Sequence, residues 1–291
     1  MGRPMALNLL NAGFPLVVHS RSQGPVRELA TAGARAASTP AEVARAATRL
    51  ITMLPDSPDV EQVLEGADGV FSALRAGTII IDMSTIAPAT ARRLADRAAA
   101  LGATMIDAPV SGGEIGAVNG TLSIMAGGDK AAFASVKSIL DAMGNPDRVI
   151  RIGESGAGQI CKVCNQMVIG GTLAAVSEAF ALARKAGVEP ALVREALLGG
   201  FASSRVLEVH GERILAGNYT PGFRAALYAK DWRIASATLA EHHTSAPVSA
   251  AVKQLVDALV ASGRGEDDYS ALATVLFDMA GLDREPAPPT V

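Results

Sequence analysis

The first half of the chain alternates short apolar runs with longer stretches of helical composition. The runs are rich in aliphatic and β-branched residues, and roughly ten to fifteen residues that favour a helix follow each of them. This alternation is typical of a parallel β-sheet wrapped by helices. The strands that it predicts lie at residues 16–19, 50–54, 78–82, 104–108 and 122–126.

One helix start in this half is specified by local chemistry. Thr39 has a side chain that can cap a helix, Pro40 suits the first helical position, and Glu42 stands at the third. A capping threonine with a glutamate at this spacing satisfies backbone N–H groups that a helix start leaves without partners. The sequence therefore predicts a helix that begins at Pro40.

The second half has a different pattern, in which alanine, leucine and glutamate dominate. A helical stretch runs from Gly158 to about Gly187, and at about 1.5 Å per residue it would span on the order of 40 Å. Further helices are expected to begin at Pro190, Val206, Lys230 and Val248 and to end near Ala280. The predicted fold class is α/β, with a doubly wound parallel sheet in residues 1–153, an all-α domain in residues 154–283 and a flexible proline-rich tail in residues 284–291.

Charge and cysteine content exclude some functions. The formal net charge is −3 and no basic stripe is present, which argues against nucleic acid as the main partner. Cys161 and Cys164 form a C-x-x-C pair, but no second pair or neighbouring histidine completes four metal ligands. We therefore expect no metal site and interpret both cysteines as small packing residues.

Two apolar segments could suggest a signal peptide or a membrane span. Residues 5–18 are interrupted by Asn8 and Asn11, and residues 168–183 contain Glu178 and are short of a full span. We interpret the second segment as a buried helix. The expectation is a cytoplasmic protein with no membrane partner.

Lys162 is the main candidate for chemistry. It lies one turn inside the predicted long helix, so Lys162, Asn165 and Gln166 stand at i, i+3 and i+4 and offer a cation and two amides on one face. Reduction of a carbonyl requires a hydride at carbon and a proton at oxygen, and a protonated lysine can supply the proton. The alternative is a solvated lysine, which is the commoner case for helical lysines.

A serine–glycine–glycine turn is a candidate anion site. Ser111, Gly112 and Gly113 follow the predicted strand at 104–108. Two successive glycines let backbone N–H groups approach an anion such as a carboxylate closely. The alternative is a tight turn that binds no ligand.

Four motifs extend over nearly the whole chain, at residues 1–10, 107–125, 153–166 and 221–231. Together they resemble the β-hydroxyacid dehydrogenase family, and most closely its tartronate semialdehyde reductase (2-hydroxy-3-oxopropionate reductase) branch. The resemblance implies a Rossmann-like NADP-binding domain followed by an all-α domain for substrate binding and oligomerisation. It also implies a homodimer or homotetramer.

The resemblance implies roles for individual residues as well. Lys162 would be the general acid, and the serine–glycine–glycine turn would bind the substrate carboxylate. Asn165 or Gln166 would hold the substrate hydroxyl, with glutamine at 166 fitting the tartronate semialdehyde branch. Without the resemblance, the Lys230–Asp231 pair would be interpreted as a solvated surface feature. The residues that it places at the cofactor are Gly2, Leu54, Pro55, Thr85 and Lys230.

The residues after the predicted strand 16–19 bear on the choice of cofactor. An NAD site usually has an acidic residue here, and Ser20, Arg21 and Ser22 provide none. A guanidinium and two hydroxyls suit the 2′-phosphate of NADP, with NAD as a possible second cofactor. The alternative is that Arg21 is an exposed loop residue and the protein does not distinguish the two cofactors.

The start of the chain departs from the family pattern. Members of the family open with a strand that runs into G-x-G-x-x-G, and only Gly2 corresponds to that fingerprint here. The sequence thus predicts that the first strand and the phosphate loop are missing. Either the start was assigned at an internal methionine or this product binds cofactor poorly, and the intact downstream motifs favour the first interpretation.

The predicted reaction is the NAD(P)H-dependent reduction of tartronate semialdehyde to glycerate. The substrate class is a small carboxylate-bearing aldehyde or a 3-hydroxy acid. One alternative is a dehydrogenase for 3-hydroxyisobutyrate or a related short 3-hydroxy acid. An alternative of another class is a non-catalytic binding protein that keeps the fold but has lost the phosphate loop.

Overall fold

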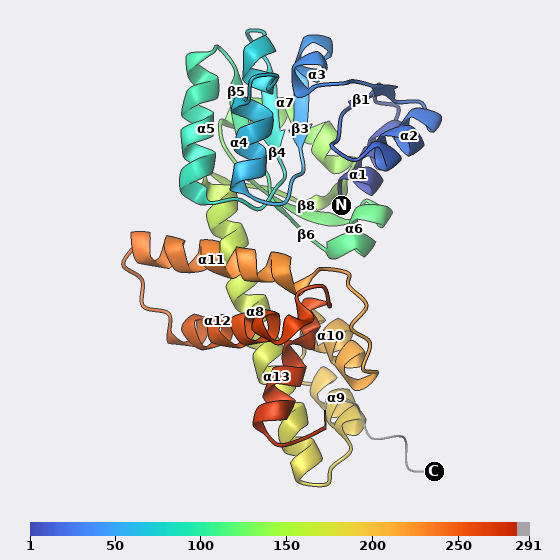
Figure 1. Ribbon diagram of the computed structural model, residues 1–291, viewed down its shortest axis with the longest axis vertical. Coiled ribbons are helices and arrows are strands. Elements are labelled where there is room, and N and C mark those ends of the chain that lie inside the picture. The colour runs from blue at the N-terminus through green and yellow to red at the C-terminus, as the bar shows by residue number, and fades with distance from the viewer. Residues whose placement is uncertain (284–291) are drawn as a thin grey trace. The chain divides into compact units, whose positions relative to one another are not determined.

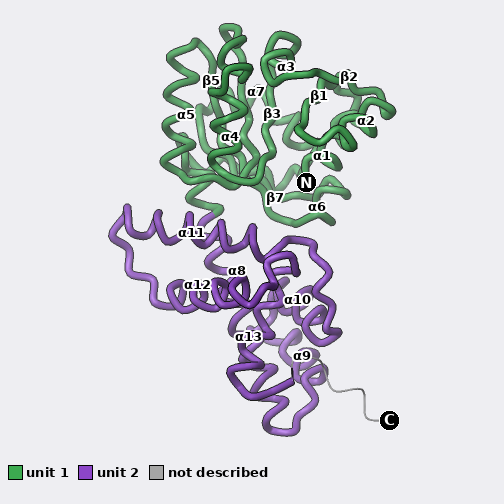
Figure 2. Tube along the Cα trace, viewed as in Figure 1, with its two compact units in different colours: residues 1–162 green, residues 163–291 purple. Residues whose placement is uncertain are grey.

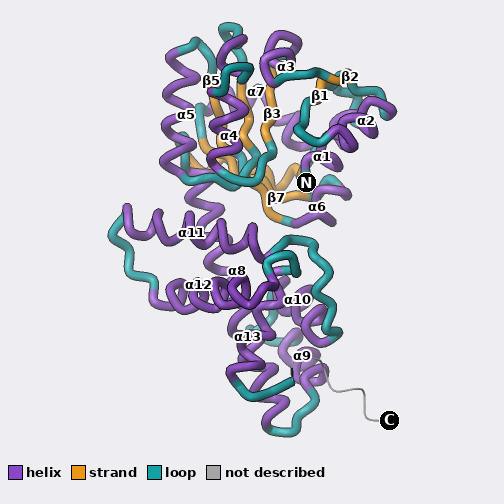
Figure 3. Tube along the Cα trace, in the orientation of Figure 1, coloured by secondary structure: helices purple, strands orange, loops and turns teal. Residues whose placement is uncertain are grey.

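The computed structural model describes residues 1–283 and contains two compact units (Figure 2). Unit 1 comprises Met1–Lys162 and unit 2 begins at Val163, so the division falls within one long helix, whereas the predicted boundary after residue 153 precedes that helix. Every strand among the described residues belongs to unit 1, and unit 2 consists of helices and loops (Figure 3). The predicted α/β domain followed by an all-α domain is confirmed. The predicted tail at 284–291 lies outside the described residues.

Unit 1 alternates helices and strands (Figure 1). Its strands are β1 (Val17–Val18), β2 (Arg35–Ala36), β3 (Arg49–Thr52), β4 (Ile79–Asp82), β5 (Thr104–Asp107), β6 (Val110–Ser111), β7 (Leu122–Gly127) and β8 (Gly144–Gly153). Its helices are α1 (Gly2–Asn11), α2 (Gln23–Thr31), α3 (Pro40–Ala46), α4 (Ser57–Glu65), α5 (Pro88–Ala100), α6 (Gly113–Asn119) and α7 (Lys130–Asp141), with a short 3₁₀ turn at Val70–Ala73.

The strands form two sheets. β1 and β2 pair in parallel as a two-stranded sheet of their own. The main sheet has the order β3-β4-β5-β7-β6, with β8 paired to β7. Strands β3, β4 and β5 are parallel, whereas β7 is antiparallel to both β5 and β6. The doubly wound sheet is therefore present, but it is mixed rather than parallel throughout.

The main sheet is buried on both faces. Ile79, Ile80 and Ile81 of β4 are all buried, and successive side chains of a strand point to opposite faces. Ile79 and Ile81 belong to one core cluster and Ile80 to the other. This two-sided burial explains the unbroken apolar run in the sequence. The clusters include Met5 of α1 and Val136 of α7 on one face, and Leu64 of α4 and Leu94 of α5 on the other.

Each of the five predicted strands is present, with slightly different ends, and the structure adds β2, β6 and β8. Strands β2 and β6 have two residues each, which is too short for a periodic signal. Strand β8 contains the exposed residues Pro146, Asp147 and Arg148, which are typical of a loop. These three residues fall within a register shift between the pairs Leu122–Gly144 and Ile124–Val149, so the pairing with β7 is made on either side of them.

The apolar start of the chain is helix α1, and it is part of the core of unit 1. Met5 and Leu9 are buried against the main sheet. The side-chain amide of Asn8 donates a hydrogen bond to the carbonyl oxygen of Ala117 in α6 at 2.7 Å. One of the polar residues that interrupt the apolar segment thus joins α1 to α6.

Unit 2 contains the rest of α8 (Ala157–Lys185) and the helices α9 (Pro190–Leu198), α10 (Arg205–Leu215), α11 (Ala225–Glu241), α12 (Pro247–Leu259) and α13 (Leu272–Met279). The predicted start at Lys230 is wrong, because α11 begins earlier. Its first residue, Ala225, donates a backbone hydrogen bond to the carbonyl oxygen of Asp267 at 2.8 Å, and Arg224 forms a β-bridge with Asp268. Contacts distant in sequence therefore set this helix start.

Helix α8 is long and apolar enough to cross a membrane by length and composition, and it is the only such helix among residues 1–283. Half of its most apolar window is buried inside the protein. Core helices of globular proteins meet the same criterion, so this observation is weak evidence for a membrane span.

The start of α3 at Pro40 is confirmed. The Thr39 hydroxyl oxygen accepts the backbone N–H of Glu42 at 3.2 Å, and the Glu42 carboxylate accepts the N–H of Ser38 at 2.7 Å. The pairing resembles a capping box in which the glutamate reaches one residue further back than usual.

We expect Thr39→Ala to lower the free energy of unfolding by about 1 kcal/mol, because it leaves an N–H group of the first turn of α3 without its acceptor. Urea denaturation followed by circular dichroism measures this change. Thr31→Ala is a matched control, because the Thr31 hydroxyl only donates to the Arg27 carbonyl within its own helix. An equal loss of stability in the two variants would contradict the capping role.

Candidate active site

Three polar side chains lie side by side at the carboxyl ends of β3, β4 and β5. Thr52, Asp82 and Asp107 occupy aligned positions in the ladder, and all three are buried. The Thr52 hydroxyl donates to Asp82 Oδ1 at 2.7 Å, and Asp82 Oδ2 has no hydrogen-bond partner within the described residues. Burial raises the pKa of Asp82 from 3.8 to about 6, although its hydrogen bonds with Ser84 and Thr52 oppose the shift.

The loops that follow β3 and β4 carry three of the predicted cofactor residues. The Leu54 N–H donates to the Ser84 hydroxyl at 2.9 Å, which joins the two loops. Pro55 is exposed, whereas Leu54 and Thr85 are half-buried. At the start of α1, a Cβ atom on Gly2 would lie 3.8 Å from the Cβ atom of Met53. Gly2 is therefore close to the loop after β3.

Ser20, Arg21 and Ser22 follow β1, as predicted. Arg21 has a side chain that is 79% exposed, and its guanidinium forms an ion pair with Asp59 of α4 at 3.2 Å. Ser22 is the N-cap residue of α2, and its side chain makes no capping hydrogen bond. The guanidinium and the hydroxyl of Ser22 are thus at the surface of unit 1, beside a helix start.

The serine–glycine–glycine turn connects a short strand to a helix. Ser111 is in β6, where it pairs with Ser123 of β7, and Gly112 precedes the first residue of α6, Gly113. Both glycines have positive φ values, 133° and 63°, in a region that side-chain-bearing residues rarely adopt. These φ values favour glycine at both positions, and the turn follows β6 rather than β5 directly.

Lys162 lies in α8 and is only 8% exposed, so it is not an ordinary solvated lysine.

The start of helix α8 is anchored in unit 1 by Asp107. The Asp107 carboxylate accepts the N–H groups of Gly156 and Gln159 at 2.7 and 2.9 Å. Burial raises the pKa of Asp107, and these backbone hydrogen bonds oppose that shift.

In unit 2, the two predicted amides belong to a chain of polar contacts between α8 and α11. Asn165 donates to Gln166 Oε1 at 2.7 Å, and Gln166 Nε2 donates to Asp231 Oδ2 at 2.6 Å. Lys230 forms an ion pair with Asp231 Oδ1 at 2.8 Å. Lys230 and Asp231 are 7% and 3% exposed, so the interpretation as a solvated surface pair is wrong.

This polar chain fixes the orientation of both amides. An ionised carboxylate only accepts hydrogen bonds, so the nitrogen of Gln166 must face Asp231 and its oxygen must face Asn165. Asn165 then uses its nitrogen to donate, and its Oδ1 atom takes no part in the chain. Of the two amides, Gln166 is the buried one and Asn165 is half-buried.

No group of three or more histidine, cysteine or acidic side chains suited to a metal occurs within residues 1–283. Cys161 is partly buried, whereas Cys164 is exposed, so the interpretation of Cys164 as a packing residue is wrong.

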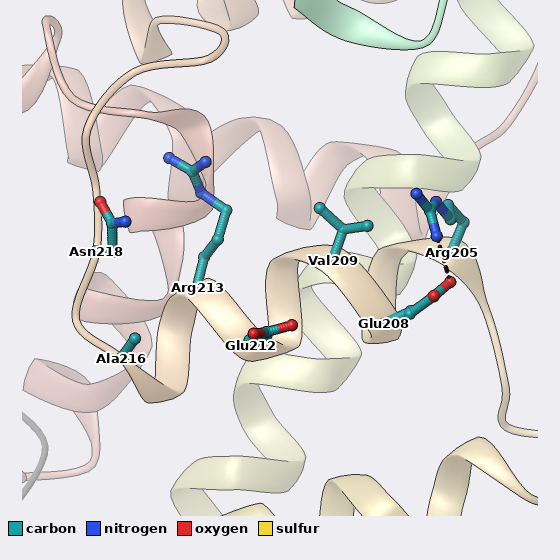
Figure 4. Close-up of a pocket in the computed structure, with 7 residues that line it drawn as sticks. All are labelled: Arg205, Glu208, Val209, Glu212, Arg213, Ala216 and Asn218. Carbon is teal, nitrogen blue, oxygen red and sulfur yellow. Dashed lines mark ion pairs between the residues drawn. The ribbon is translucent and has the colours of Figure 1, made fainter. Parts of the chain in front are cut away.

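A surface hollow of about 380 Å³ lies on helix α10 (Figure 4). Its charged side chains include Arg205 and Glu208, which form an ion pair at 2.7 Å. None of the predicted site residues lines it, so it is separate from the candidate chemistry. The lining residues are Arg205, Glu208, Val209, Glu212, Arg213, Ala216 and Asn218.

Sequence reasoning gave no role to four residues that hold the site, and one of them, Asp107, was noted only as the first residue of the motif at 107–125. Asp82 ends the buried run of β4, and an acidic residue directly after such a run is a detectable signal. Gln159 stands one turn before Lys162, at helical spacing. Asp231 was named only as the neighbour of Lys230, because its contact with Gln166 joins residues far apart in sequence.

Two family models match this chain. Residues 1–163 match the model described as the NAD binding domain of 6-phosphogluconate dehydrogenase. Residues 156–276 match the model described as NAD-binding of NADP-dependent 3-hydroxyisobutyrate dehydrogenase.

Individual proteins match over nearly their whole length. The 2-hydroxy-3-oxopropionate reductase of Escherichia coli (strain K12) is 44% identical over 281 residues, which cover 96% of this chain and 95% of that protein. The solved structure of the Mycobacterium tuberculosis 3-hydroxyisobutyrate dehydrogenase with L-serine has a TM-score of 0.86 at 30% identity, over 95% of each chain. The structure of Psf3 in complex with NADP+ and 2-OPP has a TM-score of 0.86 at 27% identity, over 95% of this chain and 96% of that one.

The raised pKa of Asp82 predicts a pH-dependent stability. The folded protein holds this proton up to about pH 6, whereas an ordinary aspartate releases it near 3.8, so ionisation of Asp82 lowers stability as pH rises between these values. The free energy of unfolding of Asp82→Asn, relative to that of the parent, should rise by up to about 3 kcal/mol between pH 4 and pH 7, since one pKa unit corresponds to about 1.4 kcal/mol. Urea denaturation at four pH values measures the difference, with the exposed Asp147→Asn as control. A difference that is flat with pH would contradict the expectation.

Proposed function

Because this chain belongs to the β-hydroxyacid dehydrogenase family of NAD(P)-dependent oxidoreductases, we propose that it reduces tartronate semialdehyde to glycerate with NADPH as the hydride donor. Family membership identifies an enzyme, which argues against a non-catalytic binding protein. The observation that carries the proposal is the burial of the Lys162 side chain on the helix that Asp107 anchors.

Lys162 acts as the general acid in this proposal. When bound, NADPH would supply the hydride for the aldehyde carbon, so negative charge would develop on the aldehyde oxygen. The Lys162 ammonium stabilises that charge and transfers a proton from Nζ to the oxygen. In the reverse direction the neutral amine accepts the proton, so oxidation becomes more favourable as pH rises.

We assign the substrate carboxylate to the backbone N–H groups of the serine–glycine–glycine turn. Support comes from Gly112 and Gly113, whose positive φ values favour glycine, so that the turn carries no side chain beyond that of Ser111. We assign the substrate hydroxyl to Asn165, whose Oδ1 atom is not used in the polar chain to Asp231. Gln166 holds Asn165 in place by accepting its hydrogen bond.

The residues present fit an NADP cofactor. No side chain caps the first turn of α1 and that turn has no acidic residue, so a helix start near Gly2 suits a pyrophosphate. The surface ion pair of Arg21 with Asp59 is worth roughly 1 kcal/mol or less, and a 2′-phosphate can replace it. Lys230 remains a proposed cofactor contact. Leu54, Pro55 and Thr85 occupy loops after strand ends, where doubly wound sheets bind nucleotides.

A second candidate is the oxidation of 3-hydroxyisobutyrate or a related short 3-hydroxy acid. It is favoured by the likeness to the Mycobacterium tuberculosis 3-hydroxyisobutyrate dehydrogenase. A panel of C3 and C4 substrates separates the candidates. A tartronate semialdehyde reductase requires a higher kcat/KM for tartronate semialdehyde than for methylmalonate semialdehyde, the aldehyde that corresponds to 3-hydroxyisobutyrate.

We expect Lys162→Met to lower kcat for aldehyde reduction at least about 10²-fold, the usual contribution of a general acid, while NADPH still binds. Stopped-flow or steady-state loss of NADPH absorbance measures turnover, and quenching of protein fluorescence measures binding. Lys185→Met is the control, since this exposed lysine lies in the last turn of the same helix. Activity of Lys162→Met within a few-fold of the parent would falsify the proposed chemistry.

We expect Arg21→Ala to raise the KM for NADPH about tenfold, which corresponds to about 1.4 kcal/mol, with little change for NADH. The reason is that only NADPH carries the phosphate that the guanidinium binds. Arg27→Ala, at an exposed arginine of α2, is the control. Equal changes for both cofactors would contradict a contact with the 2′-phosphate.

A further inference from the structure

One buried amide and one buried carboxylate fasten the first turn of α8 to unit 1. Gln159 is 0% exposed and Asp107 is 2% exposed, and neither takes part in the proposed proton or hydride transfer. We infer that Gln159 and Asp107 are positioning residues that set the place of the Lys162 ammonium. The inference rests on the proposed role of Lys162 as general acid.

Gln159 uses both ends of its side chain. Its Nε2 donates to the carbonyl oxygen of Ser84 at 2.8 Å, and its Oε1 accepts the N–H of Ile86 at 3.2 Å. The reverse orientation of the amide would place oxygen against oxygen and N–H against N–H, so only one orientation is allowed. Since Ser84 and Ile86 belong to the loop after β4, this side chain ties α8 to that strand.

Asp107 ties the same turn to β5. Its two oxygens accept the N–H groups of Gly156 and Gln159, which an isolated helix start would leave without partners. A carboxylate at this position also interacts favourably with the helix dipole. One helical turn is thus held to two neighbouring strands.

Gly158 shows how closely this turn approaches the sheet. A Cβ atom on Gly158 would lie 2.3 Å from the carbonyl oxygen of Met125 and 2.8 Å from that of Asp107. The backbone of the first turn of α8 therefore lies directly against β5 and β7. The helix has no room to move toward the sheet.

Lys162 follows Gln159 by three residues, so its backbone lies one turn further along the same rigid helix. Because the helix is continuous, a displacement of its first turn also displaces Lys162. A displacement of about 1 Å of a catalytic group can cost on the order of 10²-fold in rate. Loss of the Gln159 contacts should therefore reduce kcat while the cofactor still binds.

The test is a double-mutant cycle of Gln159→Met with Lys162→Met. Methionine keeps the length of glutamine but makes neither hydrogen bond. We expect Gln159→Met to lower kcat about tenfold or more, with the KM for NADPH within about threefold, because the residue acts on the general acid. In the Lys162→Met background the same change should alter the residual kcat by less than about twofold. Gln254→Met, at an exposed glutamine of α12, is the control.

The outcomes separate this inference from the proposed function. Equal losses from Gln159→Met in both backgrounds overturn the inference and leave Lys162 as the general acid. Full activity of Lys162→Met overturns the proposed function instead.

Gln159→Glu provides a second variant should the methionine variant fail to fold. A protonated carboxyl has one donor and one acceptor and can replace the amide, whereas a carboxylate has no donor for Ser84. The kcat of Gln159→Glu relative to the parent should therefore rise as pH falls. A ratio that does not change with pH overturns the positioning role.

Discussion

The carboxylate of Asp107 lies where a buried strand ends and a 29-residue helix begins. Backbone N–H groups at a helix start must find acceptors, and water cannot reach them at this depth. Asp107 provides the acceptors from a neighbouring strand, so the beginning of α8 depends on the sheet being correctly formed. The position of Lys162 along the helix then follows from the sheet and not from the helix alone.

A similar constraint operates in unit 2. Asp231 is a buried charge, and an unpaired charge in such a place costs several kcal/mol. It is held by Lys230 on one oxygen and by Gln166 on the other. Because each contact requires a defined donor, a single arrangement of amides is compatible with the buried carboxylate. Hydrogen bonds with defined donors, rather than apolar packing, thus determine the orientation of the Asn165 side chain.

The sequence predicted the parts of the fold that have a local signal. The apolar run of β4 and the capping residues of α3 are examples, because burial on both faces and helix capping leave marks on adjacent residues. The family motifs pointed to Lys162 and to the turn at Gly112. The early start of α11, the strand β8 and the contact of Gln166 with Asp231 had no local signal. Each depends on partners that are distant in sequence, and single-sequence patterns do not contain that information.

The separation of β1 and β2 from the main sheet has a dynamic consequence. This two-stranded ladder is held by few backbone bonds, such as those from the Arg35 and Ala37 amides to the Leu16 and Val18 carbonyls, and its residues are only partly covered. Segments with few buried contacts open by local fluctuation at a lower free energy than a central strand such as β4. The amide protons of Arg35 and Ala37 should therefore exchange with deuterated solvent well before those of β4. The part of unit 1 that carries Arg21 would then form a separate, weaker cooperative unit of the native state.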